Sequence, residues 1–352
     1  MNLNIFLFPY NGMNNNVYII KNNSYKTAIR EVLKSITYEV LESVKKYPFI
    51  TIKPNFLSVE RTESSTNPIL IEEVLKWLRT FYKGKIILAE GSPQTPEIIK
   101  KFKISALAHK YKVKIVNLKN ENNWTSFKAI DQYKRPINIR YPADIAQSYI
   151  ISLAVPKMHG NSGVSLSIKN TMGLLHIKDK KLMHGLVDDV KFAERAVLSS
   201  HWWEKHSKLG FIFDNLYGVY FRVIGRHVLS SFKKKVMIQN YYVLSQNIYS
   251  LSRVLQPSLS IIDGFGCMEG QGPWFGTIKN LHTIVASINA AAADLTMASI
   301  MSLSIDEVAY LFLLKKKNKS KLIYPIRSIN SVRFQCYNHC NFSIQKDWKK
   351  LI

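Results

Sequence analysis

The residues best suited to chemistry are concentrated in one segment, residues 155–184. Its polar members are separated by residues that are mostly apolar or small, and they include Lys157, His159, Lys169, Asn170 and His184. Taken singly, each of them is more often a solvated or structural residue than a functional one. Their density is the informative feature, because a cluster of ammonium and imidazole groups can bind an anion, hold a metal ion or move a proton.

Three of these side chains are candidates for catalysis. An imidazole titrates near neutral pH, so His159 is expected to act as a general acid or base. If the apolar neighbours of Lys169 desolvate its amine, its pKa falls and it becomes a base or a nucleophile. His184 is a catalytic candidate too, and the candidate ligand of a divalent metal.

The elements expected around this segment place it at the edge of a sheet. Residues 149–155 have the length and the β-branched content of a buried strand, and Pro156 ends it. In open α/β sheets, ligands bind at the C-terminal ends of the strands. Residues 164–175 are expected to form a helix that carries Lys169 and Asn170.

Three further expected strands also end in polar residues. The strand at 48–52 leads into Lys53-Pro-Asn55, the strand at 85–89 into Glu90-Gly-Ser92, and the strand at 258–262 into a glycine-rich loop at 263–276. Lysine and asparagine would hold an anion there by charge-assisted hydrogen bonds, and the carboxylates would orient these cations or complete a metal site. The side chains expected to bind substrate are Lys53, Asn55, Thr66, Glu90, Ser92, Lys157, Asn170, Asp263, Glu269 and Gln271.

Strands and helices are expected to alternate along the chain, with helices at 25–45, 68–82 and 95–111. This alternation is typical of an α/β protein that has a mostly parallel sheet with helices on both faces. A polar stretch at 120–142 favours two α/β lobes with a cleft between them. The expected boundaries are 17–145 for the first lobe, 146–305 for the second lobe, and 306–352 for a C-terminal helix and tail.

The composition of the 352-residue chain bounds its class. No run of about 18 apolar residues occurs, so no membrane-spanning helix is expected. The first residues lack the basic start and long apolar centre of a signal peptide. Three cysteines provide no disulfide framework, and the spacing of Cys336 and Cys340 is only a weak metal-binding pattern. A reduced, cytoplasmic setting is therefore expected.

The charge is strongly unbalanced, since 49 lysines and arginines face 24 aspartates and glutamates, for a net charge of +25. Such an excess attracts nucleic acid, anionic lipid or a phosphorylated substrate. The lysines are scattered and no nucleic-acid-binding motif accompanies them, which disfavours nucleic acid. Residues 199–240 are rich in aromatic and basic side chains, and they predict an inserted helix that either covers the core or lies on an anionic membrane surface.

Several short motifs occur in a fixed order along the chain. They are Lys53-Pro-Asn55, Glu90-Gly-Ser92, Pro156-Lys-Met-His159, Ser167-Ile-Lys-Asn170 and Met268-Glu-Gly-Gln-Gly-Pro273. This order resembles the domain-of-unknown-function family 362 over about residues 17–303. The family's Asp-Pro-Val-Ala-Val-Asp pattern here reads Asn289-Ala-Ala-Ala-Ala-Asp294, so its first acid is absent. Some relatives carry iron–sulfur cysteine sets that this chain lacks, so no iron–sulfur cluster is expected.

A fainter similarity is to the nickel-pincer lactate racemases, through the spacing of His159, Lys169 and His184. This resemblance implies that Lys169 would tether the cofactor, that His184 would bind nickel, and that His159 would be a proton-transfer base. The second base of those racemases belongs to a Gly-His pair, which here is Gly91-Ser92. A shared fold is therefore expected more than a two-base racemase.

The sequence as a whole predicts an enzyme that acts on a small anionic substrate, a carboxylate or a phosphate ester, by lysine and histidine acid–base chemistry. An isomerase or racemase is one such reaction class. The alternative is a non-catalytic basic protein that binds an anionic membrane surface or nucleic acid. The cofactor stays open, with a divalent metal as the candidate.

Overall fold

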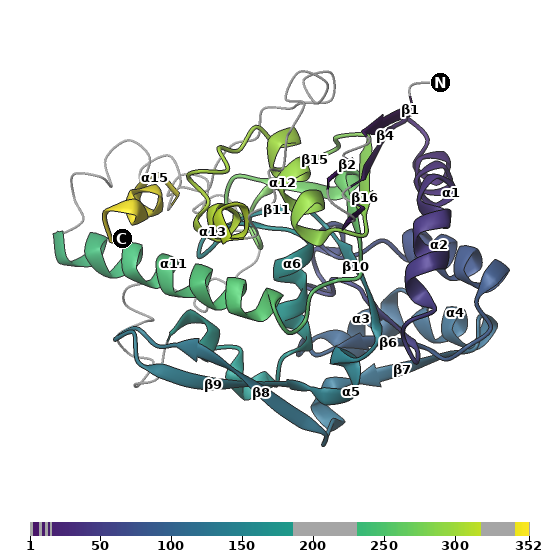
Figure 1. Ribbon diagram of the computed structural model, residues 1–352, viewed down its shortest axis with the longest axis horizontal. Coiled ribbons are helices and arrows are strands. Elements are labelled where there is room, and N and C mark those ends of the chain that lie inside the picture. Colours follow the sequence, from purple (N-terminus) through teal and green to yellow (C-terminus); the bar gives the residue numbers. More distant parts are fainter. Residues whose placement is uncertain are drawn as a thin grey trace.

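The centre of the molecule is an eight-stranded sheet (Figure 1). The structure is a computed structural model that describes residues 3–6, 9–10, 13–14, 16–185, 231–317 and 342–351. In sheet order the strands are β1 (Leu3–Phe6), β4 (Val17–Lys21), β16 (Thr283–Ser287), β13 (Leu259–Asp263), β10 (Tyr149–Ala154), β5 (Ile50–Lys53), β6 (Ile86–Glu90) and β7 (Val113–Asn117). The strands from β13 to β7 are parallel to one another, and β16, β4 and β1 pair in antiparallel fashion. The predicted α/β class with a mostly parallel sheet is confirmed.

Helices cover both faces of this sheet (Figure 1). One face carries α1 (Tyr25–Val44), α2 (Pro68–Phe81), α3 (Thr95–Lys101) and α4 (Ile104–Lys110), and the other carries α6 (Ser167–Asn170), α11 (Ser231–Ser252), α12 (Ala290–Ile300) and α13 (Ala309–Lys317). Side chains of each strand alternate between two hydrophobic cores, so Ile151 packs beneath the first set of helices and Ile150 beneath the second. Strands buried on both faces explain the continuous apolar runs of the sequence.

The two lobes expected from the sequence are not confirmed, because strands from both halves share the one sheet. Strand β10 pairs directly with β5, with Ile151 opposite Ile52, so the hydrogen-bonded ladder crosses the expected boundary. The polar stretch at 120–142, which favoured two lobes, forms an antiparallel hairpin of β8 (Trp124–Ile130) and β9 (Pro136–Pro142). This hairpin is fixed to α11 by Asn247, whose side chain exchanges two hydrogen bonds of 2.8 Å with the backbone of Ile130.

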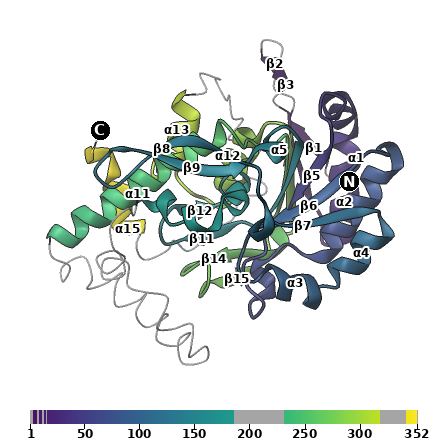
Figure 2. The same cartoon turned by 90° about the horizontal axis from the view of Figure 1, so that it is seen from below.

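A second, smaller sheet lies beside the first (Figure 2). It includes part of the segment 155–184, for which a helix was predicted after the first strand. Its strands are β12 (Gly163–Ser165), β11 (Lys157–His159), β14 (Cys267–Glu269) and β15 (Thr277–Lys279). The helix predicted at 164–175 is therefore wrong in extent: the chain forms β12, the single turn α6 and the 3₁₀ helix η3 (Thr171–Leu174). Val164 and Ser165, the first residues of the predicted helix, pair with β11 instead. The helical spacing of polar residues in this segment did not exclude such a strand.

Other predicted helix limits can be compared directly with the structure. The helix predicted at 95–111 is divided into α3 and α4 at Lys103, whose φ of 54° is left-handed. Asn67 and Asn289 cap α2 and α12 by accepting hydrogen bonds from backbone N–H groups. The shorter elements are β2 (Pro9–Tyr10), β3 (Met13–Asn14), η1 (Thr62–Ser64), η2 (Leu118–Asn120), α5 (Ala143–Ala146), η4 (Ile177–Asp179), η5 (Leu182–His184), η6 (Gly264–Gly266), α15 (Phe342–Gln345) and η8 (Lys346–Leu351).

Two predictions concern residues outside the described part of the chain. The structure does not describe residues 199–230 of the predicted insertion, nor Cys336 and Cys340. The membrane-surface and weak metal-binding interpretations therefore stay predictions. Within the described residues, every helix is too short or too polar to cross a lipid bilayer.

Candidate functional site

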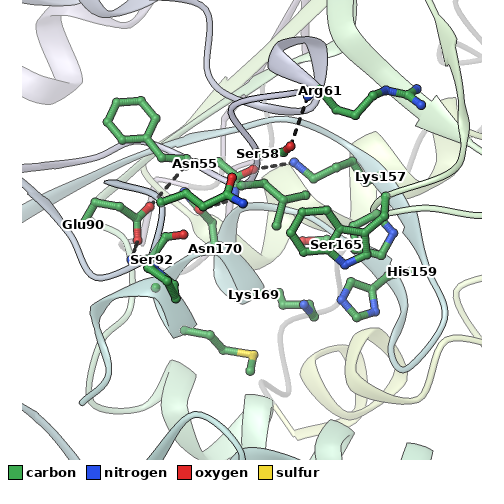
Figure 3. Close-up of a pocket in the computed structure, with 18 of the residues that line it drawn as sticks. Asn55, Ser58, Arg61, Glu90, Ser92, Lys157, His159, Ser165, Lys169 and Asn170 are labelled. Atoms are coloured by element: carbon green, nitrogen blue, oxygen red, sulfur yellow. Dashed lines mark hydrogen bonds between the residues drawn. The ribbon is translucent and has the colours of Figure 1, made fainter. Parts of the chain in front are cut away.

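A pocket of about 600 Å³ lies where the parallel strands end (Figure 3). Strands β5, β6 and β11, the turn α6 and the glycine-rich loop after β14 all contribute to its lining. Eight of the side chains predicted to form the site line it: Lys53, Asn55, Glu90, Ser92, Lys157, His159, Lys169 and Asn170. The prediction that polar strand ends meet at one edge of the sheet therefore agrees with the geometry.

The floor of the pocket contains a buried ion pair between Lys53 and Glu90. The Lys53 Nζ lies 2.6 Å from Glu90 Oε2, and the two side chains are 1% and 3% exposed. Glu90 also accepts hydrogen bonds from the N–H groups of Gly91 and Ser92, at 2.8 and 3.2 Å. Burial lowers the pKa of Lys53, and the nearby Glu90 carboxylate opposes that effect. Gly173 covers the pair so closely that a Cβ there would lie 2.5 Å from Lys53 Cε, so only glycine fits.

An amide pair connects this ion pair to the next cation. The Asn170 Oδ1 accepts from Lys53 Nζ at 3.3 Å and from Asn55 Nδ2 at 3.0 Å. In turn, Asn55 Oδ1 accepts from Lys157 Nζ at 2.5 Å. Because each amide is engaged on both sides, the side chains from β5, β6, β11 and α6 are held in one arrangement.

Among the residues that the structure describes, three ammonium groups in the pocket have no carboxylate partner. Lys157 donates to Asn55 Oδ1 and to the carbonyl of Ser64, and Lys180 donates to the carbonyls of Gly91 and Gly173. Within the part of the chain that the structure describes, Lys169 makes neither a hydrogen bond nor an ion pair. The cationic charge of the pocket is therefore only partly compensated by the described residues.

The pKa values of these three amines are lowered toward neutrality. Burial is the main cause for Lys157, whose pKa falls to about 7, and the charges of Lys169 and Lys53 lower it further. Burial also lowers the pKa of Lys169 to about 8 and that of Lys180 to about 8. A bound anion would reverse these shifts, because opposite charge favours the ammonium form.

Lys180 is a site residue that the sequence did not reveal. It belongs to the run Lys178-Asp-Lys-Lys181, which has the composition of a solvated loop. Its neighbour Lys178 is indeed exposed, whereas Lys180 turns inward to Gly91 and Gly173. Only the tertiary structure distinguishes these two lysines.

His159 and Lys169 point toward one another across one side of the pocket (Figure 3). The Nδ1 atom of His159 accepts a hydrogen bond of 3.1 Å from the N–H of Asn161. In the neutral ring the proton is therefore assigned to Nε2, the other ring nitrogen. An imidazole N–H donor and an amine of lowered pKa thus share the same cavity.

Asp294 positions the turn that carries Lys169 and Asn170. From α12 its buried carboxylate accepts hydrogen bonds from the N–H groups of Ser167 and Ile168, at 2.8 and 3.0 Å. These are the free donors at the start of α6. This role of Asp294 was not predicted from the sequence, because a contact across 126 residues leaves no local signal.

The titration of Asp294 gives a pH-dependent prediction. Burial raises its pKa from 3.8 to about 7. The folded protein therefore binds this proton more tightly than the unfolded chain, and stability from this group is lost as pH rises from about 4 to 7. Asp294→Asn removes the titration. The free energy of unfolding of the variant, measured by urea denaturation, should therefore increase relative to that of the wild type as pH rises from about 4 to 7. A difference that stays constant with pH would contradict the assignment.

Several predicted site residues lie away from the pocket. Thr66 connects two strand ends, since its Oγ1 accepts from the N–H of Asn55 and donates to the carbonyl of Leu153. Asp263 accepts from the Tyr25 hydroxyl and the N–H of Phe265, and Glu269 pairs with Lys279 at 3.3 Å. Together with Gln271, these side chains do not line the cavity. Their contacts fix the loops around it.

His184 also lies outside the lining, although it is near enough to Lys169 to feel its charge. Burial, followed by that charge, lowers its pKa to about 4. Among the described residues, no group of three or more histidine, cysteine or acidic side chains is arranged to hold a metal ion. The described residues therefore do not form a metal site around His184, and the catalytic and metal-binding roles predicted for it stay predictions.

The sheet and its pocket define an α/β protein with a cationic cavity at the C-terminal edge of the parallel strands. Residues 50–299 match the family described as Domain of unknown function (DUF362). Since this is more than half of the chain, the protein belongs to that family, as its motifs indicated. The match includes every residue that lines the pocket. No curated protein and no solved structure is significantly similar to the chain, so the likeness to lactate racemases receives no support.

Proposed function

We propose that the protein is an enzyme that binds a small carboxylate or phosphate ester in this pocket and moves a proton with Lys169 and His159. The observation that supports the proposal most is Lys169 itself. Its amine has a pKa lowered to about 8, and it makes no hydrogen bond or ion pair with the described residues. With this pKa, roughly a tenth of the amine is in its neutral form at pH 7, and this neutral form can take a proton from the substrate.

Binding of the anionic group is assigned to Lys157 and Lys180. Both ammonium groups are held by neutral oxygen acceptors, so neither is neutralised before the substrate arrives. Charge-assisted hydrogen bonds to an anion are stronger than bonds between neutral groups. The ion pair of Lys53 and Glu90 supports this arrangement without adding net charge.

The proposed reaction is a proton transfer at a carbon next to the anionic group. Lys169 takes the proton as an amine and becomes an ammonium, while the Nε2–H of His159 supplies a proton to the position that gains electron density. Both groups recover their starting states when the protons are exchanged with solvent or returned. An isomerisation of this kind needs no oxidant or reductant.

Exchange with D₂O tests the proposal without knowledge of the product. The protein is incubated with a panel of carboxylates and phosphate esters in D₂O, and loss of C–H signals is followed by NMR. At least one compound should exchange much faster with the wild type than with His159→Asn. A panel in which bound compounds show no catalysed exchange would contradict proton transfer.

Lys157 provides a prediction that separates binding from catalysis. Lys157→Gln should raise KM by about 10- to 100-fold, the effect of losing a hydrogen bond to a charged group worth about 1.5–3 kcal/mol. The kcat should change much less, because this contact exists equally in the ground state and the transition state. Steady-state kinetics on a substrate found by exchange measures both parameters. A fall in kcat at unchanged KM would contradict a binding role and show that Lys157 acts in the chemical step.

A further inference from the structure

The number of uncompensated charges in the pocket bears on the charge of its ligand. Lys53 is neutralised by Glu90, and the guanidinium of Arg61 donates to the carbonyl of Gly276 at 3.0 Å, with the exposed Glu60 next to it in the sequence and also in the pocket lining. The three amines without a carboxylate partner are Lys157, Lys169 and Lys180. Lys169 acts as a neutral amine in the proposed reaction, so Lys157 and Lys180 carry the charges that the ligand meets. A single negative charge would leave one of these two ammonium groups uncompensated in a partly desolvated site.

These amines occupy two places along the pocket. Lys180 is held at the carbonyls of Gly91 and Gly173, beside the Lys53 and Glu90 pair. Lys157 is held at Asn55 and Ser64 instead, and its pKa is lowered by the charge of Lys169, which places those two amines near each other. Negative charge is therefore favoured in two positions.

Part of the pocket lining is apolar or aromatic: Phe56, Leu57, Pro93, Met172, Pro273, Trp274 and Phe275. The uncharged polar side chains Ser58, Ser92, Gln94 and Ser165 also line it. Pro273, Trp274 and Phe275 come from the glycine-rich loop, which packs directly on β11: a Cβ at Gly272 would lie 2.1 Å from the carbonyl oxygen of Met158. The loop can approach so closely only because glycine stands there, and this brings the segment that carries Trp274 and Phe275 into the lining of the pocket.

From this combination, and building on the proposed function, we infer that the ligand is a dianion with a flat apolar ring, such as an aryl-substituted aliphatic dicarboxylate, in which a carbon next to a carboxylate carries the proton that is transferred. Its two charges meet the amines at the two positions of the pocket. Its ring lies against the aromatic wall, where stacking and burial of apolar surface add to the affinity. A cavity of about 600 Å³ is within the range of small-molecule sites.

Titration calorimetry with four probes tests the inference on the wild-type chain. Isophthalate carries two carboxylates on a ring, benzoate carries one, and glutarate has two carboxylates at a similar spacing without a ring. Isophthalate should bind at least about tenfold more tightly than either, which is about 1.4 kcal/mol. Phenyl phosphate carries both charges on one phosphoryl group, so it should bind more weakly than isophthalate. Tighter binding of phenyl phosphate would contradict the two charge positions.

The outcomes distinguish this inference from the proposed function. If benzoate and glutarate bind as tightly as isophthalate, the dianion inference is overturned while an anion-binding pocket remains. If neither isophthalate nor phenyl phosphate binds more tightly than glutarate, the ring is not recognised and the inference fails. If none of the four binds, the proposed function fails together with it.

A matched pair of lysines provides the variant test. Lys180→Gln should weaken isophthalate binding by about tenfold and leave benzoate binding within about twofold, because it removes one of two charge positions. Lys178→Gln changes an exposed lysine two residues away and should alter neither affinity. Thermal unfolding of both variants checks that they fold. Equal losses for benzoate and isophthalate in Lys180→Gln would contradict the two-position arrangement.

Discussion

Replacement of Lys169 by methionine is expected to lower turnover by a factor of about 10² to 10⁴, the usual contribution of a general acid or base. Methionine keeps the apolar stem of the side chain and removes the amine. That amine makes no bond to the described residues, so its loss leaves no protein group without a partner. The variant should therefore unfold at nearly the same temperature as the wild type.

The control for this experiment is Lys178→Met, which removes an exposed lysine nine positions along the chain. It should retain wild-type turnover and stability, so general effects of charge removal are excluded. Turnover is measured on the compound identified by deuterium exchange. Activity of Lys169→Met within about tenfold of the wild type would show that the amine neither accepts nor donates the transferred proton.

The largest effect on stability is expected from Glu90→Gln. This substitution leaves the buried ammonium of Lys53 without its counter-ion, and breaking one side of a buried pair costs about 3–5 kcal/mol. The neutral amide also loses acceptor capacity toward Gly91 and Ser92, which donate to the carboxylate in the wild type. Chemical denaturation of the two proteins measures the difference in free energy of unfolding.

The loss in Glu90→Gln should depend on pH in a defined direction. Burial places the pKa of Lys53 below its unfolded value, so the unfolded chain binds more protons and stability rises with pH up to about 10. The deficit of the variant should therefore shrink as pH is raised, because neutral Lys53 tolerates burial.

A surface pair provides the comparison. Glu72 lies 2.7 Å from Lys110, almost the same separation as in the buried pair, but these side chains are 34% and 61% exposed. Glu72→Gln should have little effect, since water already solvates both charges. Similar losses in the two variants would mean that burial does not set the strength of the Lys53 and Glu90 interaction.

Much of the pocket could be predicted because it follows from local pattern and one general rule. Apolar runs identified the strands that end at Lys53 and Glu90, and the strand that ends at Ala154 shortly before Lys157. The C-terminal ends of these parallel strands meet at one edge. The short separation between His159 and Lys169 in the sequence kept them together whatever element joined them. These two residues thus line one pocket, although the predicted helix at 164–175 is limited to the turn α6 and the 3₁₀ helix η3, and its first residues belong to β12.

The parts that could not be predicted depend on contacts between distant residues. The pairing of β10 with β5, which unites the expected lobes, joins segments about a hundred positions apart. Asp294 acts on Ser167 and Ile168 from another helix, and Lys180 differs from Lys178 only by the direction in which it points. Asp263 follows a strand end like the others, yet its carboxylate turns to Tyr25 and Phe265. Sequence pattern locates a strand end but does not orient each side chain there.

The most direct test of the account is to locate a bound dianion that carries a heavy atom. Crystals of the protein soaked in 5-bromoisophthalate would show the bromine by its anomalous scattering and the carboxylates by difference density. The account predicts the ring beside Trp274 and Phe275, with carboxylates in hydrogen-bonding reach of Lys157 and Lys180. Bromine density confined to the lysine-rich outer surface, with the pocket filled only by water, would contradict it.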